Sequence, residues 1–126
     1  MKVIIAGGRD YQFTDADLHW LDDLAASAKG SGNPFEEIVT GGASGADTGG
    51  WIWAKGAEIP TRKFPADWLT HGKAAGPIRN RQMAEYVGPN GLCILFPGGK
   101  GTASMESEAK RVGMRIVKYP ERHTWT

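Results

Sequence analysis

Short apolar runs that end in glycine-rich turns alternate along this chain with segments of helical periodicity. Val3 to Ala6 ends at Gly7-Gly8, Glu37 to Thr40 ends at Gly41-Gly42, and Leu92 to Phe96 ends at Pro97-Gly98-Gly99. Apolar runs this short are typical of strands buried on both faces, as in a parallel sheet. Because parallel strands need crossover connections, the segments between the runs are expected to be helices.

The periodicity predicts helices over residues 15–29, 46–55, 77–87 and 102–112, and two further strands over residues 60–64 and 116–119. Thr14 or Asp15 is expected to cap the first helix, and Gly113 the last. The polar stretch 66–77 is expected to be a long irregular loop. Right-handed crossovers then give an α/β fold, a Rossmann-like doubly wound parallel sheet of about five strands in the order 3-2-1-4-5. A single domain is expected over residues 1–120, followed by a polar tail over residues 121–126.

Composition narrows the classes of function. The chain has 126 residues with 15 Lys and Arg against 14 Asp and Glu, so its near-neutral charge argues against nucleic acid as a partner. The single cysteine, Cys93, lies in an apolar run and is expected to be buried and inert. The apolar N-terminus is too short for a signal peptide or a membrane span, so a cytoplasmic location without membrane contact is expected. His19, His71 and His123 have no metal-ligand spacing, and no metal or cofactor is expected.

The glycine-rich turns are the candidate site. In a doubly wound sheet the ligand lies outside the carboxyl ends of the strands, where the winding reverses, so the three turns are expected to meet along one edge. Glycine lets backbone N–H groups approach an anion, and a following helix N-terminus adds unpaired donors and its dipole. The turns therefore suggest a phosphate site. Tight strand-to-helix turns also need glycine for purely structural reasons, and that alternative stays open.

Known phosphate motifs do not match well. A Walker A loop fails because Gly99-Lys100 is followed by Gly101, and the dinucleotide fingerprint fails because Gly99 to Ser104 ends in serine and follows the wrong strand. The residues expected to bind a ligand are Gly7, Gly8, Arg9, Asp10, Gly41, Gly42, Ala43, Ser44, Gly45, Asp47, Asp67, Trp68, Arg79, Asn80, Gly98, Gly99, Lys100, Gly101 and Thr102.

Within that set, a few side chains carry the chemistry. Arg9 and Arg79 suit phosphate, because a guanidinium matches phosphate oxygens bidentately, although either could be a solvated surface residue. Asp47 and Asp67 are the candidate catalytic carboxylates, together with Arg79, but aspartate is also a common helix cap. Trp68 could stack on a base or pack at the edge of the core.

Several strings together resemble the YspA-type proteins, known as domain of unknown function 2493. They are GGRDY at 7–11, GGASGAD at 41–47, FPADW at 64–68, HGKAAGPIRN at 71–80 and PGGKGT at 97–102. These proteins belong to the SLOG superfamily, with the LOG phosphoribohydrolases and the DprA-type DNA-processing proteins. The resemblance runs from about Lys2 to Tyr119. It implies a Rossmann-like fold, a nucleotide-derived ligand such as an ADP-ribose-like or NAD-derived molecule, and a homo-oligomer of two or more chains.

The chain departs from the LOG pattern at one position. LOG enzymes carry Pro-Gly-Gly-x-Gly-Thr-x-x-Glu, but Met105 stands at the glutamate position. Glu106 is one residue later, about 100° around the helix, and is expected to point away. The leading hypothesis is therefore a sensor or sequestering module for a nucleotide or nucleotide-sugar. The alternatives are a LOG-like phosphoribohydrolase, which cleaves the N-glycosidic bond of nucleoside monophosphates, and a DprA-like DNA-processing accessory.

Overall fold

The five predicted strands form one parallel sheet in a computed structural model of the chain, which describes residues 1–121. The strands are Lys2–Ala6 (β1), Glu37–Thr40 (β2), Thr61–Lys63 (β3), Leu92–Leu95 (β4) and Arg115–Lys118 (β5). Their order is β3-β2-β1-β4-β5, which confirms the predicted topology. β1 pairs with β2 on one side and with β4 on the other, and the winding reverses between β1 and β4.

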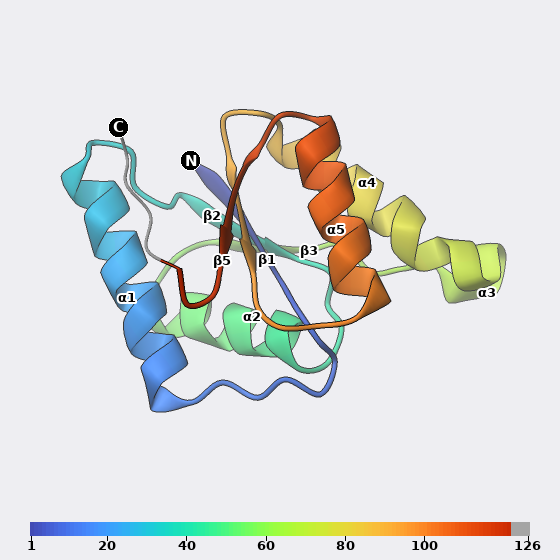
Figure 1. Ribbon diagram of the computed structural model, residues 1–126, viewed down its shortest axis with the longest axis horizontal. Coiled ribbons are helices and arrows are strands. Elements are labelled where there is room, and N and C mark those ends of the chain that lie inside the picture. Colours follow the sequence, from blue (N-terminus) through green and yellow to red (C-terminus); the bar gives the residue numbers. More distant parts are fainter. Residues whose placement is uncertain (122–126) are drawn as a thin grey trace.

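Helices cover both faces of the sheet (Figure 1). They are Asp15–Gly30 (α1), Ala46–Gly56 (α2), Trp68–His71 (α3), Ala75–Val87 (α4) and Lys100–Arg111 (α5), with a 3₁₀ turn at Gly72–Ala74. α1 and α2 lie on one face, and α4 and α5 lie side by side on the other. The short helix α3 lies at the right-hand end of the molecule in Figure 1, beside the start of α4.

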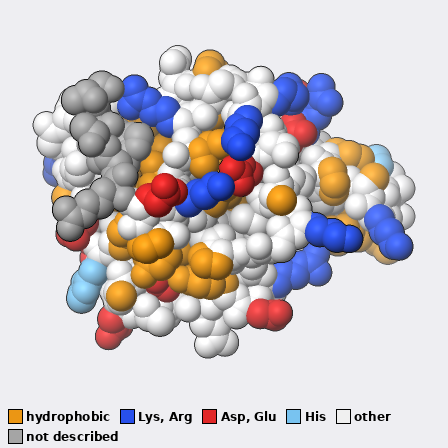
Figure 2. Space-filling view, in the orientation of Figure 1, with side chains coloured by type: hydrophobic (Ala, Val, Ile, Leu, Met, Phe, Trp, Pro, Cys, Tyr) orange, Lys and Arg blue, Asp and Glu red, His pale blue; other side chains and the backbone are white. Residues whose placement is uncertain are grey.

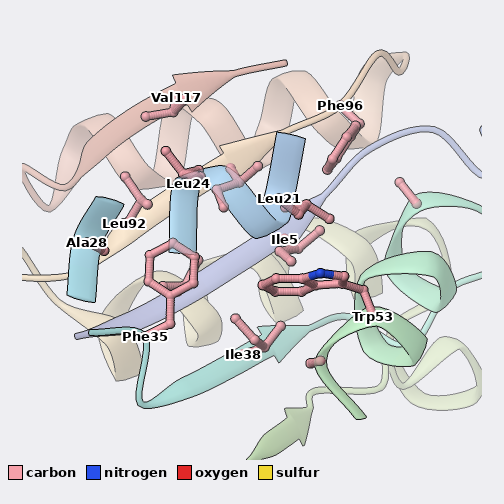
Figure 3. Close-up of a cluster of buried hydrophobic side chains, with 14 residues drawn as sticks. Ile5, Leu21, Leu24, Ala28, Phe35, Ile38, Trp53, Leu92, Phe96 and Val117 are labelled. Carbon is pink, nitrogen blue, oxygen red and sulfur yellow. The ribbon is translucent and has the colours of Figure 1, made fainter. Parts of the chain in front are cut away.

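Alternate strand residues supply the two halves of the core. Ile5, Leu92 and Val117 face α1 and α2, where they pack with Leu21 and other apolar side chains of those helices (Figure 3). Their strand neighbours face α4 and α5 instead and pack around two buried methionines, Met83 and Met105. Because both faces of β1 and β4 are buried, these strands are apolar without alternation, as the sequence predicted.

The helix ends follow the predicted signals closely. Thr14 caps α1, and its side chain accepts from the Asp17 amide while the Asp17 side chain accepts from the Thr14 amide. This capping box satisfies two amides that the helix itself leaves unpaired. Gly113 follows the end of α5 with a φ of 78°, a conformation that glycine adopts at little cost. Trp53 on α2 is buried and donates from Nε1 to Asp22 over 2.9 Å, which joins α2 to α1.

One expectation about the middle of the chain is wrong. Residues 66–77 do not form a long irregular loop, since they contain α3, a 3₁₀ turn and the start of α4. The reason is local hydrogen bonding. The Asp67 carboxylate accepts from the Thr70 amide and so caps α3, and Gly72 ends that helix with a φ of 54°. Pro77 lies in the first turn of α4, as predicted.

The remaining expectations concern the chain end, the membrane and the cysteine. Apart from Glu121, the predicted tail 121–126 lies outside the described residues. None of the helices within residues 1–121 has the length and apolar character needed to span a bilayer. Cys93 is fully buried, and burial raises the pKa of its thiol to about 12, so it is inert at neutral pH, as expected.

Candidate functional site

The three glycine-rich turns meet at the carboxyl ends of β1, β2 and β4. The amide of Gly8 donates to the carbonyl oxygen of Pro97 over 2.8 Å, and the amide of Ala46 donates to the Gly8 oxygen over 3.1 Å. Two glycines allow this contact. A Cβ at Gly45 would meet the Gly8 and Arg9 carbonyl oxygens, and a Cβ at Gly98 would lie 2.7 Å from the Gly8 amide nitrogen. The turns form one packed unit, as the sequence predicted.

This packing changes the interpretation of the amides. The Gly8 and Ala46 amides already bind carbonyl oxygens, and the Ala43 amide donates to Asp47 Oδ2 over 3.2 Å. The expectation that the amides of all three turns point at an anion is therefore wrong for these three groups. In the first two turns, glycine chiefly permits close backbone packing.

The third turn leaves its amides available. α5 begins at Lys100, and its N-cap residue, Gly99, provides no side-chain acceptor. The first amides of a helix have no partner within the helix, so those of Lys100, Gly101 and Thr102 are donors for an external group. The helix dipole adds partial positive charge at the same place, and Lys100 adds a full one. The end of α5 is thus the part of the edge best suited to an anion.

A cavity of about 520 Å³ opens in front of this helix end. Its floor is apolar, with Ala6 on β1, Met83 on α4 and Met105 on α5, and all three are buried. Its remaining lining residues are Gly7, Gly8, Arg9, Ala43, Asp47, Trp68, Lys73, Gly76, Pro77, Arg79, Asn80, Gly99, Lys100, Gly101, Thr102 and Ser104. This volume lies within the usual range for small-molecule sites. We call it the α5 cavity.

A second cavity of about 550 Å³ adjoins the first. The turn after β2 and the segment after β3 line it, through Gly41, Gly42, Ser44, Pro65 and Ala66. The two cavities share Arg9, Ala43, Trp68 and Arg79 as lining residues. We call it the β2 cavity. Four predicted site residues line neither cavity, namely Asp10, Gly45, Asp67 and Gly98.

Asp47 is the most buried charged residue of the site, and Arg79 is half-buried. The Asp47 side chain is only 6% exposed. Burial raises the pKa of Asp47 from its usual 3.8 to about 6, although hydrogen bonds from the Ala43 and Gly41 amides and the positive charge of Arg79 oppose that rise. The carboxyl group therefore titrates near neutral pH, which is the range useful for proton transfer.

Arg79 is held by the protein itself. Its Nη1 donates to the carbonyl oxygens of Gly41 and Phe64, and its Nε donates to Asn80 Oδ1 over 3.0 Å. Burial lowers the pKa of Arg79, with the negative charge of Asp47 acting in the opposite direction. The predicted phosphate ligand Arg79 is thus largely occupied in orienting the walls of the site.

Arg9 is placed differently. It is exposed, and its guanidinium carbon lies 5.6 Å from the centre of the Trp68 ring, within range of a cation–π interaction. Trp68 is 48% exposed at the beginning of α3. At this end of the molecule, Figure 2 shows hydrophobic side chains with Lys and Arg beside them. Arg9 and Trp68 together form an exposed rim over both cavities.

Asn80 links the α5 cavity to the helix end. It is 4% exposed, and its Nδ2 donates to the Gly101 carbonyl oxygen and to Ser104 Oγ, each over 3.2 Å. Its Oδ1 accepts from Arg79. This amide therefore fixes α4 against the first turn of α5 and sets the width of the cavity.

The remaining predicted carboxylates lie at the surface. Asp67 caps α3, and its hydrogen bonds with Thr70 lower the pKa of the carboxyl group. Asp10 is exposed in the turn after β1. Glu106 points away from the site, as expected, and pairs with Lys110 over 3.2 Å and Lys118 over 2.9 Å. Of the candidate carboxylates, Asp47 is the one that lines a cavity.

Sequence reasoning missed most of the apolar lining. Gly76, Met83 and Met105 line the α5 cavity, but none of them was among the residues expected to bind a ligand. The spacing of Gly76, Asn80 and Met83, four and then three residues apart, places them on one face of α4. That spacing is the signal that could have added Met83 to the predicted set. Within residues 1–121 no group of three or more metal-ligating side chains gathers.

Comparison with known proteins assigns the class. The arrangement described above is a Rossmann-like domain with a glycine-lined cleft at the point where the winding of the sheet reverses. The chain belongs to the YspA, cpYpsA-related SLOG family, whose family model matches residues 1–71. It is also similar to the "Gene 61 protein" of Mycobacterium phage D29, with 31% identity over 131 residues that cover 96% of this chain and 98% of that protein. No solved structure matches the chain.

Proposed function

We propose that this protein binds a nucleotide or nucleotide-sugar in the α5 cavity and acts as a sensor or sequestering module for that molecule. The observation that carries the proposal is the uncapped N-terminus of α5, which opens into a cavity with an apolar floor. Such a cavity offers an anion seat and a surface for an uncharged ring, which are the two parts of a nucleotide. SLOG family membership supports a nucleotide-related function.

The phosphate seat is the first turn of α5. A phosphate there accepts from the amides of Lys100, Gly101 and Thr102, and the helix dipole favours its charge. A Cβ placed at Gly99 or Gly101 would have no neighbour within 4 Å, so the approach to these amides is open. Arg9 at the rim adds a mobile positive charge that can close over the bound anion.

The ring half of the ligand is expected to rest on Met83 and Met105. Thioether side chains fill irregular gaps and make favourable contacts with aromatic rings. Trp68 at the rim offers an aromatic ring as a further contact. By the resemblance of its sequence motifs, the ligand would be ADP-ribose-like or NAD-derived.

Titration calorimetry against AMP, ADP-ribose, NAD and their guanine and uracil counterparts tests the proposal. Gly101→Asp places a carboxylate beside the amides of α5, where acidic residues favour helix formation, so the fold is kept. We expect this variant to lose at least about tenfold in affinity for any nucleotide that binds, a change of about 1.4 kcal/mol. The matched control Gly101→Asn has nearly the same shape without the charge. No heat with any nucleotide of the panel would overturn the proposal.

One observation favours hydrolysis of the ligand as a second candidate. Asp47 lies in the α5 cavity with a pKa of about 6, so a fraction of it is protonated at neutral pH. A protonated carboxyl group can donate to the base that leaves when an N-glycosidic bond breaks. The resulting activity would be that of a phosphoribohydrolase. Chromatography of nucleoside monophosphates incubated with the protein tests it, since base should be released by the wild type and not by Asp47→Asn.

A further inference from the structure

The β2 cavity has no role in the proposal above. It is as large as the α5 cavity, about 550 Å³ against about 520 Å³, yet a mononucleotide seated at α5 leaves it empty. The two cavities adjoin at the residues that line both, which are Arg9, Ala43, Trp68 and Arg79. They are therefore two halves of one cleft. We call the residues that line both halves the waist of the cleft.

The waist carries excess positive charge. Arg9 and Arg79 both border it, and Asp47 is the acidic residue that lines the α5 cavity beside them. Arg9 and Arg79 lie close enough that the charge of Arg9 contributes to lowering the pKa of Arg79. Two guanidinium groups and one carboxyl group line this region of the α5 cavity, so it carries a net positive charge, which a bridging anion neutralises.

The phosphate seat of α5 and the waist border the same cavity, since Gly8, Arg9 and Lys100 all line it. Gly8 binds Pro97 through its backbone, so the turn after β1 lies directly against the turn that leads into α5. The next residue along, Arg9, is at the waist. A chain of two phosphates can therefore run from the α5 amides past Gly8 to the arginines.

The lining of the β2 cavity suits a polar ring. Gly41, Gly42 and Ala43 line it on one segment, followed by Ser44, whose hydroxyl group donates to the Arg9 carbonyl oxygen over 3.3 Å and can still accept a hydrogen bond. Trp68 forms the side nearest the waist. Carbonyl and hydroxyl groups beside one aromatic face are a common environment for a sugar, whereas the methionine floor of the other half suits a base.

We infer that the protein takes a two-part ligand, a nucleoside diphosphate that carries a second sugar or nucleoside, with the diphosphate across the Arg9–Arg79 waist and the second part in the β2 cavity. This inference rests on the proposed function and adds the place where the second part of the ligand binds. A mononucleotide occupies only half of the cleft, so the two-part ligand binds more tightly.

Matched ligand pairs test the inference by calorimetry: AMP with ADP-ribose, GMP with GDP-mannose, and UMP with UDP-glucose. In at least one pair the diphosphate sugar should bind at least about tenfold more tightly than the mononucleotide. Ala66→Trp and, in a second variant, Pro65→Trp fill the β2 cavity alone, because neither residue lines the α5 cavity, and a folding failure of one leaves the other. Each should remove the tenfold preference and leave mononucleotide affinity unchanged.

Gly101→Trp is the matched control, because Gly101 lines the α5 cavity alone. It should weaken both members of each pair. Equal affinity of the wild type for mononucleotide and diphosphate sugar would overturn the two-part inference and leave the proposed function intact. Equal weakening of both ligands by Ala66→Trp and Pro65→Trp would do the same. Absence of binding by every nucleotide would overturn both proposals together.

Discussion

Arg79 donates from Nη1 to the carbonyl oxygen of Gly41 over 2.6 Å, and the guanidinium group lies where a side chain at position 41 would begin. A Cβ on Gly41 would meet the guanidinium group of Arg79 and would lie 2.9 Å from Asp47 Oδ2. The absence of a side chain at Gly41 thus lets the buried charged pair lie against the turn after β2.

Gly41→Ala is therefore expected to destabilise the protein. The added methyl group must displace a guanidinium that several hydrogen bonds hold, and overpacking of this kind costs about 1–3 kcal/mol. Urea unfolding followed by circular dichroism measures the change. Gly56→Ala is the control, since a Cβ there would have no neighbour within 4 Å, and it should leave the stability equal or slightly higher. Equal stability of the two variants would contradict the tight contact.

The buried carboxyl group of Asp47 predicts a particular pH dependence. Its folded-state pKa is about 6 and its usual value is 3.8, so between these pH values the folded state binds more protons than the unfolded state. Stability contributed by this group therefore falls as the pH rises through that window. A shift of about two pKa units corresponds to roughly 3 kcal/mol at most.

Asp47→Asn removes this titration and keeps an oxygen that can accept from the Ala43 amide. The difference in unfolding free energy, variant minus wild type, should increase in favour of the variant between about pH 4 and pH 6.5. Urea unfolding at several pH values measures it. Asp67→Asn serves as the comparison: hydrogen bonds with Thr70 lower the pKa of Asp67, so its removal should produce no such increase. A constant difference for Asp47→Asn would show that the carboxyl group titrates normally.

The fold could be predicted from local patterns because each strand has a recognisable sequence pattern. Apolar runs such as Leu92 to Phe96 are too short and too uniform for surface helices, and the glycines after them mark the sheet edge where a ligand can lie. The site edge follows from topology alone. Where the prediction failed, between residues 66 and 77, the cap from Asp67 to Thr70 decided the structure, and a polar stretch hides so short a signal.

The use of the amides and of Arg79 could not be predicted in the same way. Whether the Gly8 amide is available depends on Pro97, almost ninety positions further along the chain, and on how closely two turns pack. Likewise, the sequence presents Arg79 as a phosphate ligand, while the carbonyl oxygens of Gly41 and Phe64 use its donors. Such contacts exist only once the sheet has brought distant turns together.

Thr40, at the end of β2, offers a test of stability away from the ligand. Among the residues that the structure describes, its hydroxyl oxygen is buried without a hydrogen-bond partner. Thr40→Val replaces that hydroxyl with a methyl group and should raise the unfolding free energy by about 1 kcal/mol. Thr14→Val, which removes the cap of α1, should lower it by about 1 kcal/mol. Thermal and urea unfolding of both variants measure the two opposite effects. A lower stability of Thr40→Val would show that the Thr40 hydroxyl has a hydrogen-bond partner.

Substitutions of Arg9 and Arg79 should separate effects on ligand binding from effects on the free energy of unfolding. Arg9 is exposed and stacks near Trp68, so Arg9→Met should leave the unfolding free energy within about 0.5 kcal/mol of the wild type. It should nevertheless weaken nucleotide binding about tenfold or more, because a charge-assisted contact to phosphate is lost. Arg79→Met removes the donors to Gly41 and Phe64 and the charge beside Asp47, and should cost about 2 kcal/mol or more of stability. Calorimetric binding and urea unfolding on the same preparations distinguish the roles, and equal loss of stability in both variants would show that Arg9, too, is chiefly structural.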